Sequence, residues 1–176
     1  YVISGDGFSS PQGYFAILNE NPDDTVTLTA VSGLQRIYGP AEGDRLRLSS
    51  IQDRNGNQLS FDYNLAGNLQ TITDPLNRTL TLFYNGADQV SYVEDFTGRQ
   101  TQFGYELDLL TTITSPLVTG TSNGNDFPDG RTTLYNYNET GRLASIISPN
   151  EVADNSLTPS VQIIYDTNQV SISSLI

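Results

Sequence analysis

Five amino acids are missing from this chain of 176 residues: lysine, histidine, cysteine, methionine and tryptophan. Without histidine and cysteine the chain has no imidazole base, no thiolate nucleophile, no disulfide and no metal site built on those ligands. Without lysine it has no Schiff base and no phosphate-loop lysine. These absences remove the side chains on which most catalytic sites depend, so we expect no enzymatic activity and no bound cofactor.

Basic residues are also scarce. Eight arginines stand against 20 aspartates and glutamates, which gives a formal net charge of −12. Nucleic acids and anionic membrane surfaces bind basic patches, so neither is an expected partner. No apolar run approaches the roughly 20 residues that cross a bilayer, and we expect no membrane insertion.

The chain has no initiator methionine and no visible signal peptide. It begins and ends within apolar segments, Tyr1-Val2-Ile3 and Leu175-Ile176. We therefore expect a piece of a longer polypeptide or a processed product.

Short alternating runs and turn dipeptides take the place of helix signals. Asn-Gly or Asp-Gly pairs occur at 6–7, 55–56, 85–86, 123–124 and 129–130, and they separate runs such as 25–29 and 80–84. These pairs favour tight hairpin turns, and the alternation of apolar and polar residues is typical of half-buried strands. The sequence therefore predicts an all-β fold of many short strands.

A period of 21 residues runs through most of the chain and is marked by Asp53, Asp74 and Asp95. A unit reads Gly-Arg or Asn-Arg, an alternating strand that ends in aromatic-x-Tyr, a short turn, and Leu-x-x-Ile-x-Asp-Pro. Such self-similarity indicates a repeat array. We expect lead-in hairpins over residues 1–32 and an array over 33–176, with units at about 33–53, 53–74, 74–95, 95–116, 116–149 and 149–176. Insertions at about 117–128 and 151–159 interrupt the last two.

Each unit predicts two strands, and the second strand has an unusual spacing. In the first strand, Leu59, Phe61 and Tyr63 share one face because side chains alternate. In the second strand the apolar residues are three positions apart, as in Leu69 and Ile72. A β-bulge between the two positions would return both side chains to one face, and a bend in every unit would curve the stacked sheet.

Two sets of residues define the array. The first set is expected to pack each hairpin against the next: Phe61, Tyr63, Leu69, Ile72, Leu82, Tyr84, Val90, Phe103, Tyr105, Leu110, Ile113, Tyr135, Tyr137, Leu143, Ile146, Ile163 and Tyr165. The second set is expected at strand ends and turns: Asp53, Asp74, Asp95, Gly56, Gly98 and Gly130.

This pattern resembles the YD repeat of Rhs-type proteins. The resemblance is carried by residues 51–59 followed by Phe61-Asp62-Tyr63, and by the recurring Gly-Arg, aromatic-x-Tyr and Ile-x-Asp-Pro motifs. Related proteins include Rhs toxin shells, toxin-complex shell proteins and teneurin-like YD shells. The resemblance implies stacked β-hairpins in a curved, twisted sheet, a shell or solenoid-like segment, and a structural role.

Several residues admit a second interpretation. The tyrosines of successive units (Tyr63, Tyr84, Tyr105, Tyr137 and Tyr165) suit either hairpin packing or a saccharide groove. The polar residues near them (Asp62, Asn64, Asn85, Asn138 and Asp166) suit either turn capping or ligand binding. Asp74 with Arg78, and Asp95 with Arg99, suit ion pairs between hairpins.

Three further motifs are weighed. Residues 123–130 place oxygen ligands at alternate positions before a glycine, as in a calcium loop, but no glutamate closes it, and a polar loop is the preferred interpretation. Adjacent carboxylates at Asp23-Asp24 and Glu94-Asp95 would point to opposite faces of a strand, unlike a glycosidase pair. Asn77 and Asn138 match the N-glycosylation acceptor pattern.

We therefore predict a secreted or surface-exposed structural array, bacterial by resemblance, which serves as a wall segment of a shell or scaffold. Its partners are flanking repeats of a longer chain or copies of itself. A binding module for an extracellular glycan or a cell surface, and a self-assembling fibre subunit, are the alternatives.

Overall fold

The computed structural model describes residues 2–4, 7–9, 12–13, 15–39, 46–122, 124, 126–165 and 170–174. The chain divides into two compact units, Tyr1–Thr81 and Leu82–Ile176. Fourteen strands, β3 to β16, are hydrogen-bonded neighbours in sequence order, and β1 and β2 form a separate pair. The all-β class predicted from the sequence is confirmed, with one five-residue helix among the described residues.

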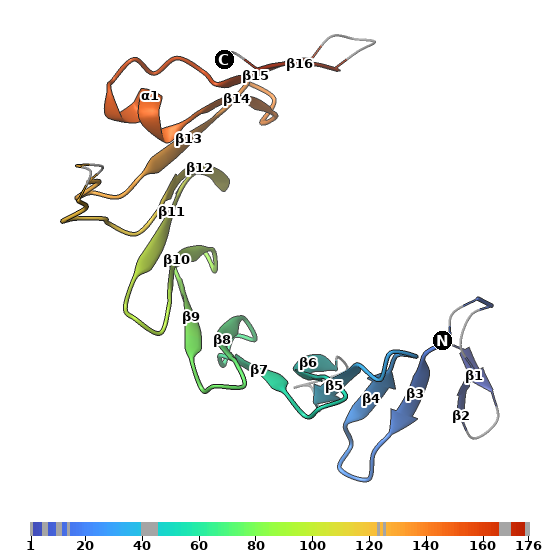
Figure 1. Ribbon diagram of the computed structural model, residues 1–176. Helices are drawn as coiled ribbons and strands as arrows, with labels where there is room; N and C mark the ends of the chain where they lie inside the picture. The colour runs from blue at the N-terminus through green and yellow to red at the C-terminus, as the bar shows by residue number, and fades with distance from the viewer. Residues whose placement is uncertain are drawn as a thin grey trace. The chain divides into compact units, whose positions relative to one another are not determined.

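The first unit contains the lead-in segment and the first repeats (Figure 1). Its strands are β1 (Val2–Ser4), β2 (Gly7–Ser9), β3 (Ile17–Glu20), β4 (Val26–Thr29), β5 (Gln35–Gly39), β6 (Arg47–Gln52), β7 (Gln58–Tyr63) and β8 (Leu69–Thr73). Strand β9 (Thr79–Tyr84) begins in this unit, and Thr79–Thr81 pairs with β8.

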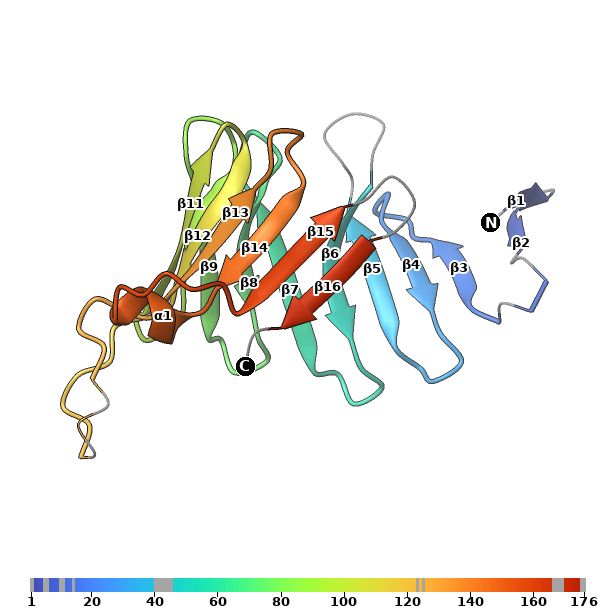
Figure 2. The ribbon, with the colours of Figure 1, turned by 90° about the horizontal axis from the view of Figure 1, so that it is seen from above.

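The second unit continues the same pattern of antiparallel strands (Figure 2). It contains β10 (Val90–Glu94), β11 (Gln100–Glu106), β12 (Leu109–Thr114), β13 (Thr132–Tyr137), β14 (Leu143–Ile147), β15 (Val161–Tyr165) and β16 (Val170–Ser174). The insertion at 117–128 lies between β12 and β13. The insertion at 151–159 lies between β14 and β15 and contains most of α1 (Pro149–Ala153), which lies against β13.

Aspartates close the turns between one hairpin and the next. The Oδ1 atom of Asp53 accepts hydrogen bonds from the backbone N–H groups of Asn55 and Asn57, at 2.8 and 2.9 Å. Asp74 and Asp95 make the equivalent pairs of bonds with the second and fourth residues after them. The 21-residue period of aspartates is therefore a period of turns in which the carboxylate holds the backbone.

Asparagines take the same place in the turns within each hairpin. Asn85 Oδ1 accepts from the N–H groups of Ala87 and Gln89, and Asn138 Oδ1 accepts from those of Thr140 and Arg142. Asn64 accepts from Asn68. For these three residues the structure shows the turn-capping interpretation, since the carbonyl oxygen that a ligand would need already accepts backbone hydrogen bonds.

The predicted bulge is confirmed. In the β7–β8 hairpin, Phe61 lies opposite Ile72 and Tyr63 lies opposite Leu69, with a register shift between Asp62 and Tyr63. Strand β8 therefore carries one extra residue, Gln70, between the two apolar positions. The same shift precedes the tyrosine in β5–β6 and β13–β14, and falls between Gly104 and Tyr105 in β11–β12.

Hydroxyl side chains at the bulge bind the backbone that the bulge disturbs. Ser49 Oγ donates to the carbonyl of Ile37 at 3.0 Å, and Thr111 Oγ1 donates to that of Gly104 at 3.2 Å. Ser91 occupies the same place in its unit and donates to Phe83. The extra residue thus supplies a partner for a carbonyl that irregular pairing would leave under-satisfied.

The aspartate turns generate a pH prediction. Hydrogen bonds hold the pKa of Asp53, Asp74 and Asp95 below the usual 3.8, and the first cause is the bond from the side chain of Asn57, Arg78 and Thr97, respectively. A carboxyl with a lowered pKa stabilises the folded state above its unfolded pKa and loses this effect as the pH falls. We expect this contribution to be constant from pH 7 to about 5 and to decline below about pH 4.

The measurement is urea denaturation across this pH range, compared between the chain and Asp95→Asn. The amide keeps an acceptor oxygen but does not titrate, so the variant should lose less stability than the parent between about pH 5 and 2. An identical acid profile for both proteins would contradict the assignment.

Candidate functional site

One face of each unit is apolar. The pairing register places these side chains of the first unit on a common side: Val26, Leu28, Tyr38, Leu48, Ile51, Leu59, Phe61, Tyr63, Leu69, Ile72 and Leu80. In the second unit the corresponding side carries Leu82, Tyr84, Phe103, Tyr105, Leu110, Ile113, Tyr135, Tyr137, Leu143, Ile146, Val161, Ile163 and Tyr165. We call this side the apolar face.

All 17 residues predicted to pack between hairpins lie at strand positions and are half-buried. Val90 begins β10, and the other 16 belong to the apolar face. The six predicted turn residues lie in turns, where Gly56, Gly98 and Gly130 have positive φ angles. Among the described residues, the buried apolar side chains are only Ala16, Val26 and Ile147.

Three tyrosines of the apolar face bind the backbone of the preceding repeat. Tyr63 Oη donates to the carbonyl of Leu48 at 2.9 Å, Tyr137 Oη to that of Leu110 at 2.8 Å, and Tyr165 Oη to that of Leu143 at 2.9 Å. In all three cases the acceptor is the leucine at the start of the bulge. The hydroxyl therefore joins equivalent points of successive repeats.

The strand pairing explains why a tyrosine is needed there. Between repeats the ladder is short: β6 and β7 pair only from Ser50↔Ser60 to Gln52↔Gln58, and β12 and β13 pair over three positions also. Beyond these positions the bulged strand no longer follows its neighbour. The long tyrosine side chain spans the interval and gives the leucine carbonyl a hydrogen-bond donor.

Arginines cover two of these tyrosine rings. The guanidinium of Arg47 lies 5.2 Å from the ring centroid of Tyr63, and that of Arg142 lies 5.4 Å from Tyr165. Each arginine directly precedes the leucine whose carbonyl the tyrosine binds. Arg47 Nη1 also donates to the carbonyl of Gly67, in the turn that follows Tyr63. The arginine and the tyrosine therefore form a two-point contact between neighbouring repeats.

The remaining tyrosines of the stripe occupy equivalent strand positions. Tyr84 ends β9 and is half-buried, and burial raises its pKa. Tyr105 lies opposite Leu110 next to the bulge of its own hairpin. For Tyr63, Tyr137 and Tyr165, packing accounts for both the ring and the hydroxyl, which leaves no saccharide contact to explain these positions.

The other candidates of the sequence fall into local structural roles. Asp62 accepts a hydrogen bond from Thr71 Oγ1 across the hairpin, and Asp166 lies outside the described residues. Arg78 and Arg99 form ion pairs with Asp74 and Asp95 at 2.5 and 2.7 Å. Both pairs lie within a single turn between hairpins. Because they are exposed, each contributes little to stability.

The loop weighed as a calcium site is held by its own carboxylate. Asp126 accepts hydrogen bonds from the N–H groups of Gly120 and Thr121 and from the Thr121 hydroxyl, and these bonds lower its pKa. Asn123 and Asn125 lie outside the described residues. In the part of the chain that the structure describes, no three acidic side chains gather as metal ligands would.

The carboxylate pairs and glycosylation motifs lie at turns or strand ends. Asp23 accepts from Thr25, Glu94 accepts from the amide of Gln100, and Asp95 belongs to its turn. Asn77 and Asn138 are exposed turn residues. None of the helical segments described is long and apolar enough to span a membrane.

Sequence reasoning missed two features of the repeat contact. The arginines at 47 and 142 were recognisable only as part of a Gly-Arg-Leu pattern, with no indication that they cover a tyrosine of the next unit. The stacked pair of Phe83 and Tyr92, with centroids 4.2 Å apart, lies on the face opposite the apolar one. Phe83 interrupts the polar alternation, which was the available signal.

Regular hairpins joined in sequence order, with one tyrosine contact per repeat, define a class of all-β repeat proteins. The Teneurin YD-shell family model matches residues 19–169, and the chain therefore belongs to this family. The YD-repeat resemblance is thus confirmed. The family is a structural shell domain and is no known enzyme family. A search of curated proteins found no match.

The tyrosine contact generates a mutational prediction. Tyr137→Phe removes the donor to the carbonyl of Leu110 and should destabilise the second unit by about 1 kcal/mol. Tyr135→Phe is the matched control, since its hydroxyl has no hydrogen bond among the described residues of the same strand and neighbouring strands. Urea denaturation of both variants measures the difference. Equal losses would show that the hydroxyl bond contributes nothing specific.

The Arg47 contact generates a second one. A Cβ added at Gly67 would lie within 2.6 Å of three guanidinium atoms of Arg47, at a φ of 84°. Asp88 occupies the corresponding turn position at a φ of 58°, so the clash is the larger cause. Gly67→Ala should cost about 1–2 kcal/mol, and Gly86→Ala, which meets open space, should cost less. Thermal unfolding distinguishes the two, and equal midpoints would contradict the prediction.

Proposed function

We propose that this chain is a wall segment of a larger protein shell, with the apolar face directed toward the enclosed side. The observation that carries the proposal is the state of that face. Its aromatic and aliphatic side chains are half-buried by neighbouring repeats and continue through each unit without a covering layer. Soluble monomers rarely leave so large an apolar surface open to water.

The two faces of the second unit differ in chemistry as the two sides of a wall would. The apolar face carries no ionisable acid or base among its residues listed above. The opposite face carries mainly hydroxyl and amide side chains, such as Gln102, Thr112, Thr114 and Asn136. The charges of an acidic chain are concentrated in turns and on this second face, where they favour solubility.

The contact between repeats supports extension by addition of hairpins. Each tyrosine binds the same carbonyl of the repeat before it, so a further repeat in the same chain, or another copy, meets the same pattern. We therefore include flanking repeats as the principal partners. By analogy with exported Rhs-type shells, we also propose a secreted or surface location.

Cysteine labelling tests the wall, because the chain has no cysteine of its own. Leu80→Cys places a thiol on the apolar face and Thr79→Cys places one on the opposite face of the same strand; both positions are exposed in this chain. In the complete polypeptide that contains this segment, we expect a bulky maleimide to label position 79 and to be excluded from position 80. The isolated chain should label at both.

Equal labelling of both positions in the complete polypeptide would overturn the proposal of an enclosed face. Small maleimide reagents provide the control for a buried but reachable thiol. A particle without an internal space in electron micrographs of the complete polypeptide would also count against a shell.

A further inference from the structure

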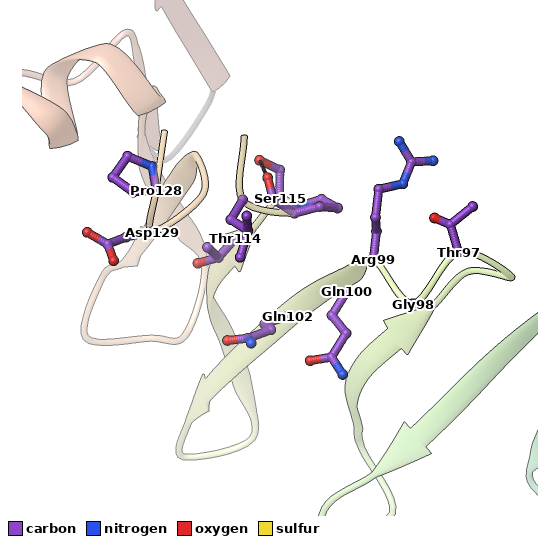
Figure 3. Close-up of a pocket in the computed structure, with 11 residues that line it drawn as sticks. Thr97, Gly98, Arg99, Gln100, Gln102, Thr114, Ser115, Pro128 and Asp129 are labelled. Atoms are coloured by element: carbon purple, nitrogen blue, oxygen red, sulfur yellow. Dashed lines mark hydrogen bonds between the residues drawn. The ribbon is translucent and has the colours of Figure 1, made fainter. Parts of the chain in front are cut away.

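The insertion at 117–128 forms one side of a pocket in the second unit. A β-bridge between Val118 and Phe127 and the hydrogen bonds of Asp126 give this insertion a defined shape. The pocket has a volume of about 460 Å³, within the range of small-molecule sites. Figure 3 shows Pro128 and Asp129 on one side, Thr97 and Arg99 on the other, and strand residues between them.

Two polar groups of this pocket have no protein partner among the described residues. The carboxylate of Asp129 and the carboxamide of Gln102 are exposed and make no hydrogen bond or ion pair there. The other polar groups are engaged: Arg99 pairs with Asp95, Gln100 donates to Glu94, and the Thr114 hydroxyl shares a bond with Thr132. The pocket thus presents one carboxylate and one amide to a ligand.

The chemistry of these groups selects the ligand class. A carboxylate accepts hydrogen bonds from two neighbouring hydroxyls, and an amide both donates and accepts. The apolar lining comes from Pro116, Leu117 and Pro128, which offer C–H surfaces and no hydrogen-bond donors. The unpaired charge is negative in a chain of net charge −12, which disfavours an anionic ligand. A neutral ring bearing adjacent hydroxyls satisfies all of these conditions.

We propose that this pocket binds one residue of a neutral saccharide, with Asp129 and Gln102 holding adjacent hydroxyls and the two prolines and Leu117 covering the ring. The site is separate from the apolar face and from the tyrosine stripe, because Gln102 and Thr114 lie on the opposite face of the sheet. It does not depend on the wall function. A shell segment with this pocket would carry a glycan contact on its polar side.

The test is a titration of the ¹⁵N-labelled chain with neutral monosaccharides and disaccharides: glucose, galactose, mannose, N-acetylglucosamine, maltose and cellobiose. We expect saturable shifts of the Gln102 side-chain amide and of the Thr114 and Leu117 backbone amides. Asp129→Asn and Gln102→Ala should each weaken binding about tenfold, as loss of a hydrogen bond from a bound ligand does. Glu106→Gln, an exposed acid outside the pocket, should bind like the parent.

Four results would overturn the proposal. They are no shift of the pocket amides with any of these sugars, shifts confined to Tyr135, Tyr137 and their neighbours, unchanged affinity in both pocket variants, or equal shifts on addition of calcium chloride alone. The variants change exposed side chains, and unchanged spectra outside the pocket verify that each one is folded. Loss of the wall function in the labelling experiment leaves this outcome unaffected.

Discussion

The structure depends on a hydrogen bond between a tyrosine hydroxyl and a leucine carbonyl one repeat earlier. The bond is needed because each hairpin contains a bulge at that leucine. The extra residue separates the strand from its outer neighbour, and backbone pairing between repeats ends after about three positions. A side chain long enough to reach the carbonyl, and apolar enough to pack on the way, is required at one place per repeat. Tyrosine meets both conditions, which explains its period.

Most of this arrangement follows from the sequence because it is local. The aspartate period gave the turns between hairpins, since an aspartate that caps backbone N–H groups must stand at the first turn position. The three-residue spacing of Leu69 and Ile72 gave the bulge, since a regular strand alternates with a period of two. Which carbonyl the bulge leaves for Tyr63, and that Arg47 lies over the ring, depend on the register between repeats. No spacing within one repeat contains that information.

The insertions were the least predictable part for the same reason. Their residues lack the repeat pattern, so the sequence indicated only that the array is interrupted. In the second insertion, α1 lies against β13, where Leu134 and the buried Ile147 pair on the otherwise polar face. Those two residues break the polar alternation at one place, and a covering element follows. The first insertion does not cover its strand in this way and leaves a pocket beside Gln102 and Asp129.

A single layer of strands places a limit on what the chain does alone. Contacts run mainly from each hairpin to the next, so stability rises with the number of neighbours and hardly at all with depth of burial. Such a sheet keeps an apolar face that its own elements do not cover. Evolution has two remedies for an uncovered face: a second layer, or closure of the sheet around an interior. Outside α1 the described residues supply no second layer, while the repeat contact is built to continue the first. The physical properties of the face and of the contact therefore point to the same function: enclosure by repetition.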